Sequence, residues 1–350
     1  MRLIPALDGY RGIAILCVML FHAALLPIGW VGVPIFFTLS SFLITTLQYE
    51  QRERPAREYF ASFWKRRVLR LFPLHFLYAA LMAIPLFWFS QRPLLQLFTL
   101  GTFTYNFATF FRWESNPLCE HFWSLGVEMQ FYLLWPALIL ALKERSTLQT
   151  AGLTAILLGP AARFLGYWLA DTLGVSNGTF AFPIFWVDAF GWGAFLALAP
   201  CSPAALFRQQ RWRLVVPAAA SLLSLAALAM KPGVIKGSMV CVAAAVLLYL
   251  ALYTRLSAVL EWRWLRFLGT ISYGLYVWHF AINNALFHYW PCPPLSAAAV
   301  LRFLAGILPL TLLVALFSYR FIEQPFLRRK THPQPASPVP PAFPVKTENR

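Results

Sequence analysis

Long apolar runs dominate this sequence and restrict it to one class of fold. Each is roughly 17–25 residues long, enough for a helix that crosses a hydrocarbon core of about 30 Å. Hydrophobic residues make up 59% of the chain and charged residues 12%, whereas typical soluble domains are about 45–50% apolar and about 25% charged. We therefore expect an all-α integral membrane protein. The candidate segments are 11–28, 30–49, 71–91, 94–112, 121–142, 150–170, 184–200, 213–230, 238–254, 268–290 and 298–319.

The positive charges predict how these segments are threaded through the membrane. The net charge of +16 could suggest a nucleic-acid partner, but basic residues of a membrane protein are first counted against loop topology. The stretch from Gln51 to Arg70 holds seven of them and is assigned to the cytoplasm as a loop. Segment 94–112 is predicted to be re-entrant or interfacial, since crossing there would put Arg328 and its basic neighbours outside. About ten transmembrane helices remain, with both termini cytoplasmic and no nucleic-acid partner.

Two further features bear on domain organisation. Residues 1–330 are expected to form one membrane domain, and the proline-rich residues 331–350 a disordered cytoplasmic tail. The five cysteines show no metal-binding spacing, so neither a metal nor a disulfide framework is implied. Cys119 and Cys292 lie on the same predicted side and could pair if that side is oxidising.

Ionisable residues within apolar helices are costly and are therefore candidate site residues. Arg11 and His22 lie eleven positions apart, which places them on one helix face about 16 Å from each other. Arg11 could simply reach towards lipid headgroups, and His22 could hydrogen-bond a neighbouring helix. A histidine that is neutral at its usual pKa of about 6.5 could equally serve as a general base.

A second group begins at the fifth candidate segment. His121, Ser124 and Glu128 share one helical stripe through spacings of three and four. Glu128 could be a structural partner of another helix or a carboxylate that orients a histidine. Arg163 and Asp188 are expected to form a buried ion pair.

The remaining polar candidates are histidines and a basic run. His279 is a weaker site candidate, and His75 is expected near the inner interface. Arg66, Arg67 and Arg70 could set topology, bind anionic lipid, or bind phosphate through bidentate contacts.

Five stretches, in this order, resemble acyltransferase family 3, the bacterial membrane O-acyltransferases that modify surface glycans and related acceptors. The resemblance covers residues 5 to 330 approximately and implies functional roles for Arg11, His22, Arg67 with Arg70, Glu128 and Glu323. Pro34, Ser41 and Met129 depart from the family pattern. The stretches are LDGYRGIAILCVMLFH (7–22), GWVGVPIFFTLSSFLIT (29–45), FWKRRVLRLFPLHFLY (63–78), HFWSLGVEMQFYLLWP (121–136), and LGTISYGLYVWH (268–279) followed by SYRFIEQPF (318–326).

The resemblance implies transfer of an acyl group, with acetyl-CoA as the expected donor, to a hydroxyl of a glycan or similar acceptor in the bacterial inner membrane. Acyl-CoA would bind at Arg66, Arg67 and Arg70, and its thioester would reach His22. Glu128 or Glu323 would orient His22.

Stabilisation of the oxyanion and contacts with the substrate are assigned to Ser124, Trp123, Tyr132 and His279.

The alternative function is a proton-coupled transporter or flippase with a relay of His22, Glu128 and His279.

Overall fold

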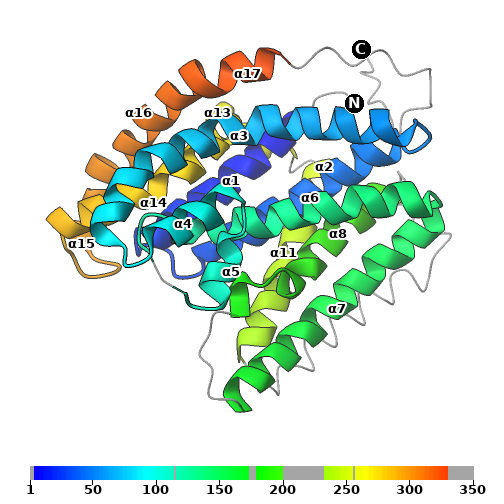
Figure 1. Cartoon of the computed structure of the whole chain (residues 1–350), viewed down its shortest axis with the longest axis horizontal. Coiled ribbons are helices and arrows are strands. Elements are labelled where there is room, and N and C mark those ends of the chain that lie inside the picture. The colour runs from blue at the N-terminus through cyan, green and yellow to red at the C-terminus, as the bar shows by residue number, and fades with distance from the viewer. Residues whose placement is uncertain (1–3, 114–115, 173–178, 200–231, 255–256, 330–350) are drawn as a thin grey trace.

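A computed structural model of the chain describes residues 4–113, 116–172, 179–199, 232–254 and 257–329. Every regular element in these ranges is helical, so the predicted all-α class is confirmed (Figure 1). The elements, in chain order, are α1 (Pro5–His22), η1 (Gly29–Val31), α2 (Gly32–Tyr49), α3 (Ala56–Phe89), α4 (Pro93–Gly101), α5 (Tyr105–Phe110), η2 (Glu120–Phe122), α6 (Trp123–Leu142), α7 (Arg145–Thr172), η3 (Thr179–Ala181), η4 (Pro183–Trp186), α8 (Val187–Leu198), α11 (Pro232–Tyr253), α12 (Ser257–Leu260), α13 (Arg263–Thr270), α14 (Ser272–Tyr289), α15 (Ala297–Arg302), η6 (Phe303–Ile307), α16 (Leu308–Ser318), η7 (Tyr319–Glu323) and α17 (Gln324–Arg328).

Six helical segments within the described ranges are long and apolar enough to cross a membrane. Each matches one of the candidate segments in the sequence, so a multi-pass membrane protein is supported. The count of about ten spans stays a prediction. The six segments are Gly29–Tyr49, Ala56–Trp88, Glu120–Leu142, Arg145–Thr172, Gly233–Tyr253 and Ala297–Arg328.

The five remaining candidate segments are not among these six. α1 and α14 have 18 residues each, about 27 Å of helix, and Pro183–Leu198 is shorter. Segment 94–112 is split into α4 and α5, with nine and six residues, neither long enough to cross a hydrocarbon core. The predicted span 213–230 and the predicted tail 331–350 lie outside the described residues.

The basic stretch after α2 is not the loop that we expected. α3 begins at Ala56 and continues for 34 residues, about 51 Å, so Lys65 to Arg70 belong to the helix. No glycine interrupts this segment, and arginine and lysine are good helix formers. The charged first turns therefore extend the spanning helix instead of preceding it.

α1 lies inside the bundle, with α2, α13 and α14 packed against it, while α7, α8 and α11 form a second group (Figure 1). Two glycines set how closely α1 meets its neighbours. A Cβ on Gly9 would lie 1.7 Å from the carbonyl oxygen of Leu260, and one on Gly269 would lie 1.7 Å from that of Asp8. The backbones touch at these points, and no side chain fits between them.

Large apolar side chains face outward from several spanning helices. Trp88 is 81% exposed and Leu134 is 73% exposed. An apolar surface of this kind is expected for helices that contact lipid tails.

Two smaller points concern single side chains. His75 is buried, with its ring stacked on that of Phe103, and its place near the inner interface stays a prediction. Cys119 and Cys292 are both free thiols, so the pairing considered above is not formed.

Candidate active site

α1 carries Arg11 and His22, and each lines a different cavity. Eleven residues of α-helix separate them by about 16 Å. We refer to the cavity that contains His22 as the outer cavity and to the one that contains Arg11 as the inner cavity, following the side of the membrane that the positive charges predict.

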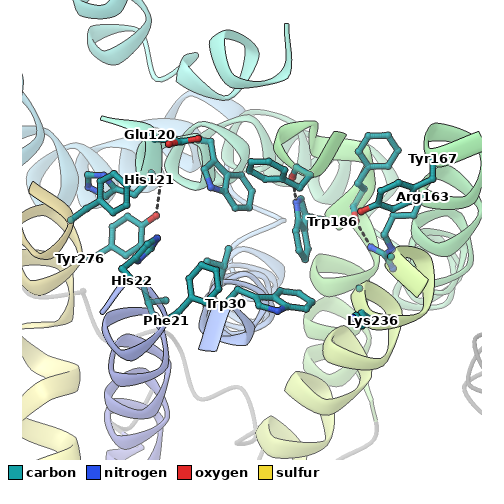
Figure 2. Close-up of a pocket in the computed structure, with 18 residues that line it drawn as sticks. Phe21, His22, Trp30, Glu120, His121, Arg163, Tyr167, Trp186, Lys236 and Tyr276 are labelled. Carbon is teal, nitrogen blue, oxygen red and sulfur yellow. Dashed lines mark hydrogen bonds between the residues drawn. The ribbon is translucent and has the colours of Figure 1, made fainter. Parts of the chain in front are cut away.

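The outer cavity has a volume of about 550 Å³. His22, His121 and Tyr276 lie at one end, and Arg163 and Lys236 lie at the other (Figure 2). Its wall is mostly aromatic, which gives flat apolar surfaces on several sides. The aromatic residues include Phe21, Trp30, Trp123, Phe180, Trp186 and Phe280.

His22 is the last residue of α1, and its ring contacts α14. Nδ1 of His22 lies 3.0 Å from Nε2 of His279, and the ring of Phe280 meets the His22 ring edge-on at 4.7 Å between centroids. The amide of Asn283 donates to the backbone carbonyl of His22 at 2.9 Å. α14 thus holds both the side chain and the backbone of His22.

Arg302 supports the same end of α1 from α15. Its guanidinium donates to the carbonyl of Ala23 at 3.5 Å and to that of Trp290 at 3.0 Å, and it is only 1% exposed. Carbonyls at the end of a helix lack partners within the helix and carry partial negative charge, so a buried cation is favourable there. Asn283 and Arg302 were not predicted from the sequence, because their role depends on a contact between distant helices.

His121 brings a third imidazole to this end of the outer cavity. It is buried, with Nε2 3.3 Å from the carbonyl of Val277 and its ring centroid 5.5 Å from that of His279. The sequence indicated only that His121 shares a stripe with Ser124. No group of three or more His, Cys, Asp or Glu side chains in the described ranges is arranged to hold a metal ion.

The inner cavity is much smaller, about 80 Å³, and four of the residues that line it are charged. Arg11 forms an ion pair with Asp8 at 2.9 Å, and the guanidinium of Arg67 lies 4.8 Å from the ring centroid of Tyr132. Arg70 also lines the cavity. The predicted grouping of Arg67 and Arg70 is therefore present, and Arg11 joins it.

Arg66 does not line the inner cavity. Arg67 and Arg70 are three residues apart and lie on one face of α3, whereas Arg66 is rotated by about 100° from Arg67. The expectation that all three arginines share one site is corrected accordingly.

Glu128 belongs to the inner cavity and does not contact His22. Its carboxylate accepts hydrogen bonds from the hydroxyl of Ser40 and from that of Tyr132, the latter at 2.5 Å. α6 runs in the opposite direction to α1, so residues that follow His121 lie progressively farther from His22. Glu128 does not orient His22 as we expected, and no hydrogen bond in the described ranges links it to the histidines.

Two other predicted site residues also lie away from His22. Glu323 is 3% exposed, lies beside Gly274 and lines neither cavity, although the charge of Arg70 acts on it. Tyr132 lies in the inner cavity with Glu128, too far along α6 to serve as an oxyanion donor beside His22.

The two cavities meet at Val33 and Tyr276, which line both. The hydroxyl of Tyr276 donates to the carbonyl of His121 at 2.6 Å, and the Ser124 hydroxyl lies 2.5 Å from it. Trp123 lines the outer cavity and Ser124 the inner one. Tyr276, which no sequence pattern singled out, therefore divides the two cavities.

The predicted pair of Arg163 and Asp188 is confirmed. One guanidinium nitrogen donates to the carboxylate at 3.0 Å, a second also contacts it, and Ser238 accepts from the arginine at 3.0 Å. The pair is buried, so its charges are satisfied within the protein.

Comparison with known proteins gives consistent matches over nearly the whole chain. A family model described as an acyltransferase domain matches residues 4–320. The peptidoglycan O-acetyltransferase OatA of Listeria monocytogenes is 28% identical over 356 residues, which cover 93% of this chain and 56% of that protein. The O-acetyltransferase OatA of Staphylococcus aureus is 29% identical over 360 residues, which cover 94% of this chain and 58% of that protein.

The putative peptidoglycan O-acetyltransferase YrhL of Bacillus subtilis is 28% identical over 368 residues, with 93% of this chain and 55% of that protein covered. The chain thus spans about half the length of the curated relatives it matches. No solved structure matches it.

Proposed function

The chain belongs to this acyltransferase family, as its motifs indicated, and we propose that it moves an acetyl group from cytoplasmic acetyl-CoA to a hydroxyl of a glycan on the outer side. The relatives' names support acetyl as the group transferred and peptidoglycan as the glycan. The observation that carries the proposal is the position of His22, in an aromatic cavity that adjoins an arginine-lined cavity at Tyr276. The enzyme would lie in the bacterial inner membrane with about ten spans and cytoplasmic termini.

The donor would enter through the inner cavity. Arg67 and Arg70 offer planar, always charged groups for the phosphates of coenzyme A, and Arg11 lies on the same cavity. The pantetheine arm is long and thin, which suits a donor with its charged end in water and its thioester near His22. A volume of about 80 Å³ is too small for that arm, so donor binding would require Tyr276 and its neighbours to move.

The acceptor would enter through the outer cavity. Its volume of about 550 Å³ falls within the range of about 300–1,000 Å³ that is usual for ligand sites. Indole and phenyl faces such as those of Trp30 and Trp186 provide apolar surfaces for the carbon faces of sugar rings. The cavity has room for a ligand beside His22, so an acceptor hydroxyl bound there would lie within reach of the imidazole.

His22 would act as the general base for direct transfer. It accepts the proton of the acceptor hydroxyl while that oxygen attacks the thioester carbonyl carbon and forms the new C–O bond. The C–S bond then breaks, and the proton passes from His22 to the departing thiolate. Ser124 and Trp123 are the proposed donors to the developing oxyanion.

Labelled acetyl-CoA tests the proposal directly. Membranes containing the protein would be incubated with radiolabelled acetyl-CoA and peptidoglycan or its lipid-linked precursor, with other cell glycans in parallel. We expect base-labile label in the peptidoglycan fraction and a loss of about 10²–10⁴-fold for His22→Ala. The control is His288→Ala, which removes an exposed histidine from the same helix as His279 and should retain full activity.

Each contrary outcome has a distinct meaning. Retention of more than about a tenth of the rate by the His22→Ala protein would remove His22 as the base. Label in another glycan would change the acceptor and leave the enzyme class in place. Movement of an unmodified glycan across the membrane without acetyl-CoA would overturn acyl transfer.

A further inference from the structure

His279 makes one hydrogen bond on each side of its ring. Its Nδ1 lies 2.7 Å from the backbone carbonyl of Tyr276, and its Nε2 lies 3.0 Å from Nδ1 of His22. His279 is fully buried, and its ring lies among those of Tyr276, His121 and Phe280. Its position is therefore fixed from several directions.

These two contacts determine where the protons lie. A backbone carbonyl can only accept a hydrogen bond, so Nδ1 of His279 must carry a proton. A neutral imidazole has one N–H, which leaves Nε2 of His279 with a lone pair and makes it an acceptor. The hydrogen bond to His22 then requires the proton to lie on Nδ1 of His22, so that Nε2 of His22 holds the free lone pair.

The surroundings of His22 and His279 favour the neutral form of both imidazoles. Three of the four nitrogens of these two rings have partners that are not carboxylates, and a buried imidazolium without a carboxylate partner is costly. Glu128 and Glu323 lie elsewhere, as described above. Glu120 lines the same cavity as His22, and His121 is the third imidazole there.

We propose that His279 is the positioning residue of the site, and that it takes the part which an aspartate or glutamate plays in other histidine-based centres. It fixes the His22 proton on Nδ1 and directs the basic Nε2 of His22 to the acceptor hydroxyl. When His22 takes up the acceptor's proton, its Nδ1–H remains hydrogen-bonded to His279. This inference rests on the proposed role of His22 as general base.

The use of a histidine as the partner of His22 Nδ1 has a chemical consequence. A negative charge beside an imidazole stabilises the imidazolium, whereas a neutral histidine orients the ring with less effect on its charge. The site then keeps a neutral base in an aromatic cavity, with a neutral partner at Nδ1 in place of an anion that would have to be compensated.

Substitution of His279 tests the positioning role. His279→Phe keeps a ring but removes the acceptor, and we expect kcat to fall by about 10²–10⁴-fold while the KM for acetyl-CoA stays within about twofold. His279→Gln places an amide oxygen where it can accept from His22, and we expect it to restore kcat to within about tenfold of the unsubstituted protein. His288→Gln is the matched control on the same helix, with no expected change.

A purely structural role predicts a different result. The Phe and Gln proteins would then lose activity equally, in proportion to the amount of folded protein in the membrane, and this outcome would overturn the inference. An unchanged kcat for His279→Phe would overturn it as well. If His22→Ala is inactive while His279→Phe is fully active, the inference alone fails and the proposed function stands.

A spectroscopic measurement reads the tautomer in the unsubstituted protein. Solid-state ¹⁵N NMR of histidine-labelled protein in bilayers reports which ring nitrogen of His22 is protonated, with the His22→Ala spectrum used for assignment. We expect the proton on Nδ1. The carbonyl of Val18 also approaches the His22 ring, and a proton found on Nε2 would overturn the inference.

Discussion

The outer and inner cavities differ in size, charge and the way their polar groups are satisfied. The outer cavity is about 550 Å³, has aromatic walls, and holds His22 in contact with a neutral partner. The inner cavity is about 80 Å³, and its charges contact one another or nearby hydroxyls, as in Arg11 with Asp8 and Glu128 with Tyr132. The outer cavity thus has open space in this structure, whereas the inner cavity is nearly filled by its own side chains.

This difference suggests how two unlike substrates are kept apart. Phosphates need cations, and an uncharged sugar ring needs apolar surface and a few polar groups. Tyr276 separates the two environments, so the reacting groups would meet only where its side chain lies. If the cavities bind different substrates, a substitution in one cavity should change the KM for one substrate alone. Equal changes in both KM values would contradict this division.

The largest of these effects is expected at the inner cavity. Arg67→Ala removes a cavity arginine, and we expect the KM for acetyl-CoA to rise by about 10- to 100-fold, because a hydrogen bond to a charged group contributes about 1.5–3 kcal/mol. The acceptor KM should not change. Arg66→Ala is the matched control, since Arg66 precedes Arg67 but lies off the cavity. Equal increases for the two variants in steady-state kinetics would mean that general positive charge, not the cavity, binds the donor.

A smaller effect, on the other substrate, is expected at the outer cavity. Trp30→Ala removes an indole from its wall and should raise the KM for the glycan acceptor by roughly three- to tenfold, the scale of a lost aromatic contact. The KM for acetyl-CoA should stay the same. Trp264→Ala, at an exposed tryptophan of α13, serves as the control. A rise in the donor KM instead would place the donor in the outer cavity.

The contact of α1 with α13 supports the inner half of the site. Gly269→Ala would put a Cβ 1.7 Å from the carbonyl of Asp8, so the helices must separate, and we expect a loss of about 1–3 kcal/mol in stability. Gly101→Ala, at the end of α4, is the control because a Cβ there would have no other atom within 4 Å. Thermal unfolding in detergent compares the two. Similar melting temperatures would show that α1 and α13 can move apart freely.

The smallest effect is expected at the outer end of α1. Ala24 has a φ of 61°, a left-handed conformation that glycine adopts without steric cost. Ala24→Gly should therefore stabilise the protein by up to about 1 kcal/mol and leave kcat unchanged. Ala23 has a φ of −73°, so Ala23→Gly should give no such gain. A fall in melting temperature for the Ala24→Gly protein would contradict the expectation.

Prediction from the sequence succeeded where a property is local to one helix. The apolar runs predicted six segments that the structure confirms as long enough to span. Charges within two apolar segments predicted the pair of Arg163 and Asp188. The loop predicted at Lys65 to Arg70 was wrong, because a helix that extends beyond the membrane has the same composition as a basic loop. The placement of Glu128 beside His22 was also wrong, since spacing within a helix does not show which neighbour a residue faces.

By itself, the sequence determined that this chain forms helices in lipid and which ionisable residues those helices carry. Backbone hydrogen bonds must be satisfied within each apolar segment, and that requirement acts over a single helix. The tertiary structure alone decided that His22 meets His279, which lies 257 positions away, and that Glu128 joins the arginines instead. The direction and rotation of each helix decide such meetings, and they depend on packing between helices, such as the backbone contacts at Gly9 and Gly269.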